Sequence, residues 1–196
     1  MTLANYITII RILLIPVFSV FAWLYGQSVI ASEPHEPYRY LALVIFTIAA
    51  AGDALDGYVA RRLKQRTKLG SYLDPIADKF LIFSAIILLS WVPWGANDWQ
   101  IPVWFAWMVI IRDLSIGIAV AIIYLLNRKV IFRVNISSKL NTIAQLFTIG
   151  WVMLKIVPFS PVYPTMVCAF LILMSSYQYT LETIRQVIEE APKKST

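Results

Sequence analysis

Long runs of apolar residues, separated by short polar segments, make up most of the chain. A helix needs about 20 apolar residues to cross the roughly 30 Å hydrocarbon core of a bilayer. Six runs approach that length: Tyr6–Tyr25, Tyr40–Ala60, Tyr72–Trp94, Ile101–Leu126, Thr142–Pro158 and Val162–Leu181. We therefore expect an all-α integral membrane fold of six transmembrane helices, with residues 1–196 forming one domain.

The charges between these runs predict an orientation, because lysine and arginine are enriched in cytoplasmic connections. Basic residues follow the second, fourth and sixth runs, whereas the other connections are acidic or uncharged. The basic set is Arg61, Arg62, Lys64, Arg66, Lys68, Arg128, Lys129, Arg133, Lys139, Arg185, Lys193 and Lys194. Both termini are therefore expected in the cytoplasm, and a bacterial inner membrane is the favoured location.

The composition agrees with a membrane protein and argues against several other classes. Hydrophobic residues make up 59% of the chain and charged residues 14%, against about 25% charged in soluble domains. The net charge of +6 lies between apolar runs, so we do not expect a nucleic-acid partner. One cysteine and one histidine exclude a disulfide framework and a zinc cluster of the usual kind. The first apolar run contains Arg11, so we expect it to belong to the mature protein.

Four aspartates lie within or at the ends of the apolar runs, where charged side chains cost several kcal/mol and therefore indicate function. Asp53 and Asp56 fall near the end of the second run, and Asp74 and Asp78 begin the third. Helical periodicity places Asp53 and Asp56 on one face together with Gly57, Ala60 and Arg61, and it places Asp74 and Asp78 on another. Because the connection between these runs is short, the two acidic faces can meet.

Four carboxylates in one place repel one another unless protons or cations neutralise them. Oxygen ligands without histidine or cysteine are typical of Mg²⁺ or Mn²⁺ sites, and two divalent ions balance four carboxylates. A pair of such ions can stabilise the attacking and leaving oxygens of a phosphoryl displacement. The small Gly57 and Ala60 either leave room for a ligand or serve helix packing.

The spacing of these residues resembles the signature of the CDP-alcohol phosphatidyltransferase family. Asp53, Asp56, Gly57, Ala60 and Arg61 are followed after eight residues by Gly70, after three more by Asp74, and after three more by Asp78. The resemblance implies transfer of the phosphatidyl group of CDP-diacylglycerol to an alcohol, with release of CMP, by a protein that is usually a homodimer. It also implies that Asp53, Asp56 and Asp74 bind metal and that Asp78 binds metal and acts as the base. Asp56, Gly57, Ala60, Arg61 and Gly70 are then expected around the CDP group.

Other positions are similar to family members that differ in their acceptor. We expect an acceptor or phosphate site formed by Asn5, Thr8, Arg11, Arg112, Lys139, Asn141, Thr142 and Gln145. Relatives that use glycerol 3-phosphate tend to have a second lysine where this chain has Asn141. The similarity therefore favours phosphatidylglycerol as acceptor, as in a cardiolipin synthase, with glycerol 3-phosphate as the alternative.

Several interpretations stay open from sequence alone. Arg11 and Lys155 can be long basic anchors that reach the membrane surface, and Arg112 and Asp113 can simply neutralise one another. Intramembrane aspartates also occur in cation or proton transporters, although here all four lie toward one side. A catalytically idle scaffold gives no reason to retain four costly carboxylates.

Overall fold

The structure is a computed structural model, and it describes residues 3–63, 68–96, 99–125, 136–156 and 158–189. Within these ranges only the backbone is described at 3–7, 53–63, 68–76, 119–125, 136–138 and 182–189.

The described residues form helices only, and their number confirms the six helices predicted from hydropathy. They are α1 (Leu3–Ile30), α2 (Glu36–Leu63), α3 (Lys68–Trp91), α4 (Val103–Leu125), α5 (Ile136–Leu154) and α6 (Val162–Glu189). Most extend beyond the apolar runs into polar sequence. Pro37 and Pro164 lie in the first turns of α2 and α6, where a residue without an N–H group removes no helical hydrogen bond.

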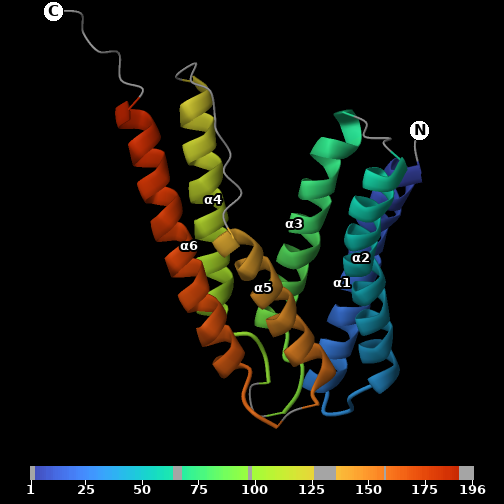
Figure 1. The fold of residues 1–196 in the computed structure, drawn as a ribbon. Coiled ribbons are helices and arrows are strands. Elements are labelled where there is room, and N and C mark those ends of the chain that lie inside the picture. Colours follow the sequence, from blue (N-terminus) through green and yellow to red (C-terminus); the bar gives the residue numbers. More distant parts are fainter. Residues whose placement is uncertain (1–2, 64–67, 97–98, 126–135, 157, 190–196) are drawn as a thin grey trace, which may run out of the picture.

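The helices run up and down as one bundle, and Figure 1 shows how their ends are distributed. The start of α1, the end of α2, the start of α3 and the ends of α4 and α6 lie at one end of the molecule. The connections from α1 to α2, from α3 to α4 and from α5 to α6 lie at the other. In packing, α1 lies along α2 and α3, α5 lies along α6, and α4 contacts α3 and α6. The ends of α2, α4 and α6, which adjoin the basic segments of the sequence, therefore share one end of the bundle.

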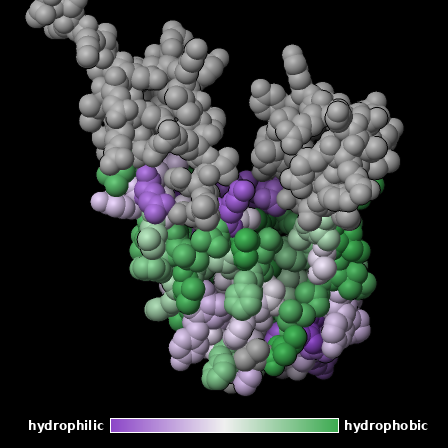
Figure 2. All heavy atoms as spheres, in the orientation of Figure 1, coloured by the Kyte–Doolittle hydropathy of each residue, from purple (hydrophilic) through white to green (hydrophobic). Residues whose placement is uncertain are grey.

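The bundle has polar groups inside and large apolar side chains outside. On α6, Thr165 and Ser175 are buried, while Phe170 and Leu173 are more than 60% exposed. Figure 2 shows broad hydrophobic areas on the outer face, with hydrophilic residues in the middle of the view and at its lower end. Soluble monomers rarely expose apolar patches of this extent, so the surface suits contact with lipid.

Among the described residues, one helical segment is both long and apolar enough to cross a membrane by its composition alone. It runs from Thr8 to Ile30 within α1. That the other helices also cross the membrane stays a prediction.

Side chains from other elements cap the C-terminal end of α5, which lies far from the aspartates. Trp99 donates its indole N–H to the carbonyl of Val152 at 3.0 Å, and Arg39 donates to the carbonyls of Met153 and Leu154 at 3.4 and 3.2 Å. The last carbonyls of a helix have no partner within it, so α2 and the α3–α4 connection supply partners for the end of α5.

Lys155 follows directly with a left-handed backbone (φ 51°), and its ammonium donates to the hydroxyl of Tyr25 at 2.5 Å. Tyr25 in turn donates to Glu36 at 3.2 Å. Lys155 is thus partly buried and bound to a residue of α1 at this end of the bundle. Its role as an anchor at the membrane surface stays a prediction. Of the tryptophans near this end, Trp91 is half exposed, whereas Trp94 is buried against Tyr25 with ring centroids 4.8 Å apart.

Candidate functional site

The acidic pattern found in the sequence falls on α2 and α3, at the end of the bundle that holds the start of α1. Asp53, Asp56, Gly57, Ala60 and Arg61 lie on the helical backbone of α2, and Gly70 and Asp74 on that of α3; their side chains lie outside the described part of the chain. α3 begins at Lys68, so Asp74 and Asp78 lie within the helix and do not begin it. α2 continues to Leu63, which places Arg61 in its last turn.

Asp78 is the one aspartate of the four whose side chain is described, and it is partly buried. Among the described side chains, no group of three or more histidine, cysteine or acidic residues is arranged to hold a metal ion. Three of the four predicted ligands lie outside that set, so the predicted metal site stays a prediction. The chemistry of the donors fits Mg²⁺ or Mn²⁺, since all four are carboxylates.

On α1, Thr8 and Arg11 are both about 1% exposed, and their spacing of three places them on one face of the helix. Asn5, the third residue of that row, lies outside the described side chains. A surface anchor keeps its charged group in water, so the burial of Arg11 contradicts the anchor interpretation and agrees with a role inside the bundle.

α5 contributes a row of buried polar residues, Asn141, Gln145 and Thr148, at steps of four and three. The side-chain amide oxygen (Oδ1) of Asn141 accepts a hydrogen bond from the Cys168 thiol of α6, with 4.0 Å between oxygen and sulfur. The Nε2 atom of Gln145 is buried and has no hydrogen-bond partner in the described part of the chain. Thr142 is partly buried on the same helix, and Lys139 is exposed near its start.

Arg112 and Asp113 pair with one another, as one interpretation of the sequence proposed, but they belong to a larger network. Arg112 donates to Asp113 at 2.6 Å and to the Ser175 hydroxyl at 3.2 Å, and Lys79 donates to the other oxygen of Asp113 at 2.5 Å. This chain of contacts joins α3, α4 and α6. Two cations share one carboxylate, so the network carries one positive charge in excess.

Sequence reasoning missed Lys79 and Ser175. Lys79 satisfies the criterion that selected the aspartates, because it is a charge inside an apolar run, so that signal was available. Ser175 carries no such signal, since a hydroxyl is common on buried helix faces and its partner depends on how α4 packs on α6.

The Arg112 guanidinium retains a donor that no described residue uses. Its Nε atom is buried without a hydrogen-bond partner in the described ranges. A buried donor left without an acceptor costs about 1–3 kcal/mol, so a ligand oxygen that accepts this hydrogen bond recovers that free energy.

Arg112 and Asn141 both reach the same face of α6, since Ser175 and Cys168 are seven residues apart. A helix rises 1.5 Å per residue, so these contacts lie about 10 Å apart along α6. The arrangement thus places a cationic donor of α4 and amide groups of α5 along one flank of α6. Such groups bind anions, whereas the predicted carboxylate cluster binds cations.

Comparisons with known proteins agree with the sequence signature. The family model described as CDP-alcohol phosphatidyltransferase matches residues 1–180. A probable phosphatidylglycerophosphate synthase of Mycobacterium tuberculosis is 33% identical over 92% of this chain and 77% of its own length. A CDP-diacylglycerol–glycerol-3-phosphate 3-phosphatidyltransferase of Bacillus subtilis is 30% identical over 90% of this chain and 92% of its own.

A protein of Pseudomonas fluorescens with the same name as the Bacillus protein is 43% identical. That match covers 45% of this chain and 41% of the Pseudomonas protein, so the chain spans less than half of that relative. The names of these relatives favour glycerol 3-phosphate over phosphatidylglycerol as the acceptor that such proteins use.

Proposed function

Because this chain belongs to the CDP-alcohol phosphatidyltransferase family, we propose that it moves the phosphatidyl group of CDP-diacylglycerol to glycerol 3-phosphate and releases CMP. Sequence similarity alone favoured phosphatidylglycerol as acceptor. The names of the relatives reverse that order, and glycerol 3-phosphate becomes the main proposal.

The observation that carries this choice is the set of buried donors on α4 and α5. Arg112 and Gln145 each hold a buried N–H group that lacks an acceptor in the described part of the chain. The phosphate monoester of glycerol 3-phosphate offers three terminal oxygens as acceptors, whereas the phosphodiester of phosphatidylglycerol offers two. Lys79 and Arg112 together carry one more positive charge than Asp113 neutralises. This net charge also favours glycerol 3-phosphate, whose phosphate is more negative than that of phosphatidylglycerol.

Asn141 is the residue that supports the second candidate. A neutral amide where other glycerol 3-phosphate users have lysine removes one cation from the acceptor site. Asn141 is buried at 1% exposure, so a lysine there would have to be paired. Phosphatidylglycerol, with a single negative charge on its phosphate, therefore stays the alternative acceptor, which would make the product cardiolipin.

In the proposed reaction the acceptor hydroxyl oxygen attacks the phosphorus on the lipid side of the diphosphate. The bond between that phosphorus and the bridging oxygen breaks, and CMP leaves with the electron pair. Asp78 accepts the proton of the hydroxyl. Arg112 holds the phosphate of the acceptor, so that the acceptor hydroxyl points toward the donor. Arg11 and Lys139 are further proposed contacts of this phosphate.

Asp53, Asp56, Asp74 and Asp78 would hold two divalent cations, Mg²⁺ or Mn²⁺, which supply positive charge to the diphosphate oxygens when bound. Gly57, Ala60, Arg61 and Gly70 would surround the CDP group. We further propose a multi-pass protein of the bacterial inner membrane, with both termini and the site on the cytoplasmic side and with two copies per assembly.

The test offers the purified protein CDP-diacylglycerol together with one acceptor at a time: glycerol 3-phosphate, phosphatidylglycerol, inositol phosphate or serine. We expect CMP release with glycerol 3-phosphate and its loss when a chelator removes divalent ions. CMP release driven by phosphatidylglycerol alone would replace the main proposal with the alternative. Undiminished turnover in the chelator would overturn the metal proposal.

The same preparation separates the other classes of function. Cation flux into liposomes in the absence of nucleotide would favour a transporter. Tight binding of CDP-diacylglycerol without turnover, under every acceptor, would favour a scaffold.

A further inference from the structure

A small cavity opens at the end of the bundle that holds the α3–α4 and α5–α6 connections. Its volume is about 230 Å³, and it is lined by Gly95, Ala96, Trp99, Lys155 and Pro158. Pockets for drug-sized ligands measure roughly 300–1,000 Å³. The cavity therefore suits one small group, such as a phosphate, and is too small for a nucleotide.

Lys155 is the cation of this cavity, and its ammonium is bound to a neutral partner. It donates to the Tyr25 hydroxyl at 2.5 Å and lies 4.9 Å from the centre of the Tyr25 ring. An ammonium has three N–H donors, and the other two have no acceptor among the residues that the structure describes. A Cβ atom on Gly95 would stand 3.3 Å from the Lys155 nitrogen, so glycine keeps the wall open beside the ammonium.

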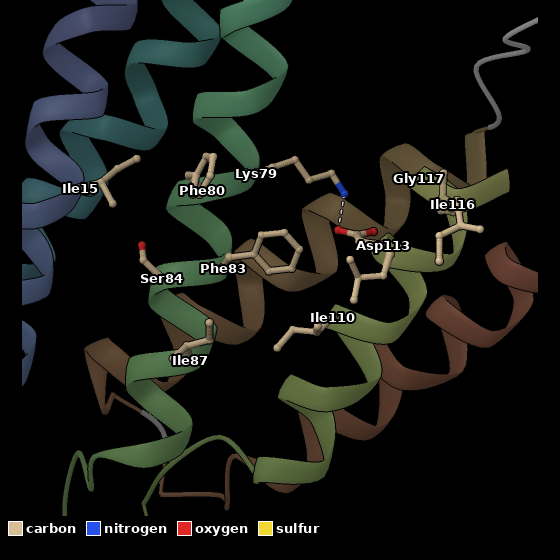
Figure 3. Close-up of a pocket in the computed structure, with 12 residues that line it drawn as sticks. Ile15, Lys79, Phe80, Phe83, Ser84, Ile87, Ile110, Asp113, Ile116 and Gly117 are labelled. Carbon is tan, nitrogen blue, oxygen red and sulfur yellow. Dashed lines mark hydrogen bonds and ion pairs between the residues drawn. The ribbon is translucent and has the colours of Figure 1, made fainter. Parts of the chain in front are cut away.

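The larger groove between α3 and α4 also contains a lysine, but that lysine is directly paired with a carboxylate. The groove measures about 910 Å³. Figure 3 shows Lys79 directed toward Asp113 among mostly apolar side chains, and their nitrogen and oxygen are 2.5 Å apart. Within the described ranges Lys155 has no such carboxylate partner, so its charge is left for an anion from outside the chain.

The charges next to Lys155 favour one kind of anion. Both oxygens of Glu36 have partners, since Tyr25 donates to Oε1 at 3.2 Å and Arg39 donates to Oε2 at 2.5 Å. Glu36, Arg39 and Lys155 together carry one positive charge. A phosphate whose head group is otherwise neutral balances that charge. The ammonium of a zwitterionic head group, by contrast, would find both Glu36 oxygens already bonded.

The surroundings of the cavity favour a lipid as the source of the phosphate. Ile156, next to Lys155, is 74% exposed, and Phe159, next to Pro158, is 63% exposed. Exposed apolar side chains beside a tryptophan and a lysine are typical of the level at which lipid chains meet their head groups. A lipid phosphate at that level lies next to the cavity.

We propose that this cavity binds a phosphate anion that the head group of an anionic lipid supplies. The phosphate oxygens accept hydrogen bonds from the Lys155 ammonium, and the adjoining carbon atoms pack on Trp99 and Pro158. Inorganic phosphate shares this chemistry and is the second source. The proposal does not depend on the function proposed above, because the cavity lies at the other end of the bundle from the start of α3, where the metal ligands are predicted.

The first experiment places a cysteine in the cavity wall by Ala96→Cys, in a Cys168→Ser background, and measures the rate of its alkylation by N-ethylmaleimide in nanodiscs. Phosphatidylcholine alone is the reference, to which phosphatidylglycerol, phosphatidylethanolamine or inorganic phosphate is added separately. We expect phosphatidylglycerol to slow alkylation at least about fivefold and phosphatidylethanolamine less than about twofold. Slowing by inorganic phosphate as well would support the same site and show that the phosphate group suffices. No slowing by phosphatidylglycerol or by phosphate, or equal slowing by both lipids, would overturn the proposal.

Ser32→Cys, in the same background, is the matched control, because Ser32 is exposed in the α1–α2 connection and does not line the cavity. Its alkylation should change less than about twofold in every mixture. Lys155→Met removes the charge and keeps the length, so it should abolish the protection of the Ala96→Cys variant, whereas Lys155→Arg should retain it. Equal slowing in the Ala96→Cys and Ser32→Cys variants, or protection that survives Lys155→Met, would overturn the proposal.

A second measurement needs no substitution and therefore holds even if Lys155→Met does not fold. The purified full chain is illuminated with a phosphatidylglycerol that has a diazirine in its head group, and the labelled peptides are identified by mass spectrometry. We expect label on peptides that contain Gly95 or Lys155. Labelling confined to peptides from the start of α1 or the start of α3 would overturn the proposal.

Discussion

Asp78 and Lys79 are adjacent on α3, and the helix separates their side chains by about 100° around its axis. Asp78 is partly buried, whereas Lys79 is exposed and pairs with Asp113 of α4. At the scale of single residues, α3 thus presents opposite charges on two different faces.

Asp78→Asn should lower the rate of CMP release by about 10²–10⁴-fold, the usual contribution of a general base. The change keeps the shape of the side chain, so we expect the same thermal unfolding midpoint by circular dichroism in detergent. Glu33→Gln removes an exposed carboxylate outside the helices and should leave the rate unchanged. A slow rate in both variants, or in neither, would contradict the role of Asp78.

Arg112→Lys should raise the KM for glycerol 3-phosphate by about tenfold or more, the size of one lost hydrogen bond to a charged group. Lysine cannot bond Asp113 and Ser175 together and still offer a third nitrogen. Kinetics at varied concentrations of each substrate checks this, because the KM for CDP-diacylglycerol should change much less. Equal loss for both substrates would indicate a merely structural role.

At the scale of helices, one very close approach lies where α1 meets the residue that follows α3. A Cβ atom on Gly26 would stand 1.8 Å from a methyl carbon of the buried Val92. Only glycine permits this distance, so the Val92 side chain packs directly on the backbone of α1 here.

Gly26→Ala should therefore lower the free energy of unfolding by about 1–3 kcal/mol, as expected for an overpacked core. Gly150→Ala meets no atom, and it should be neutral or stabilise by up to about 1 kcal/mol because alanine favours helix. Unfolding midpoints of the two variants, measured side by side in one detergent, give the comparison. A similar shift for both would mean that α1 adjusts to the added methyl group.

Hydropathy predicted which six segments are helical but misplaced their ends by up to eight residues. Hydropathy detects only the apolar part of a helix. The polar turns at the ends of α2 and α6 and at the start of α3 continue the helical hydrogen bonding beyond that part, so these helices are longer than the apolar runs. The network of Lys79, Asp113 and Ser175 could not be predicted, because its partners depend on how three helices pack. Arg11 and Asn141 are buried inside the bundle, and the phosphate-binding roles that their motifs implied stay predictions.

At the scale of the whole molecule, the ends of the bundle differ in the chemistry that they present. Charged sequence adjoins the end that holds the aspartate helices. The contacts of Trp94 and Lys155 with Tyr25, and of Trp99 with the end of α5, lie at the other. This asymmetry supports the orientation that the basic segments predict.

Single cysteines can test the orientation, because Cys168 is the only cysteine of the chain and is buried. In a Cys168→Ser background, Ser32→Cys should react with an impermeant maleimide on intact bacteria. Lys139→Cys, at an exposed position near the start of α5, should react only after the membrane is opened. The reverse pattern would place the site outside the cell.

The partners that Arg39 and Trp99 give to the last carbonyls of α5 have an effect at a distance. Asn141 and Gln145 lie on that same helix, so contacts at the far end of the bundle help to set its height and rotation. If these two residues hold the acceptor as proposed, we expect lipids or detergents that disturb the Trp99 contact to weaken acceptor binding from a distance.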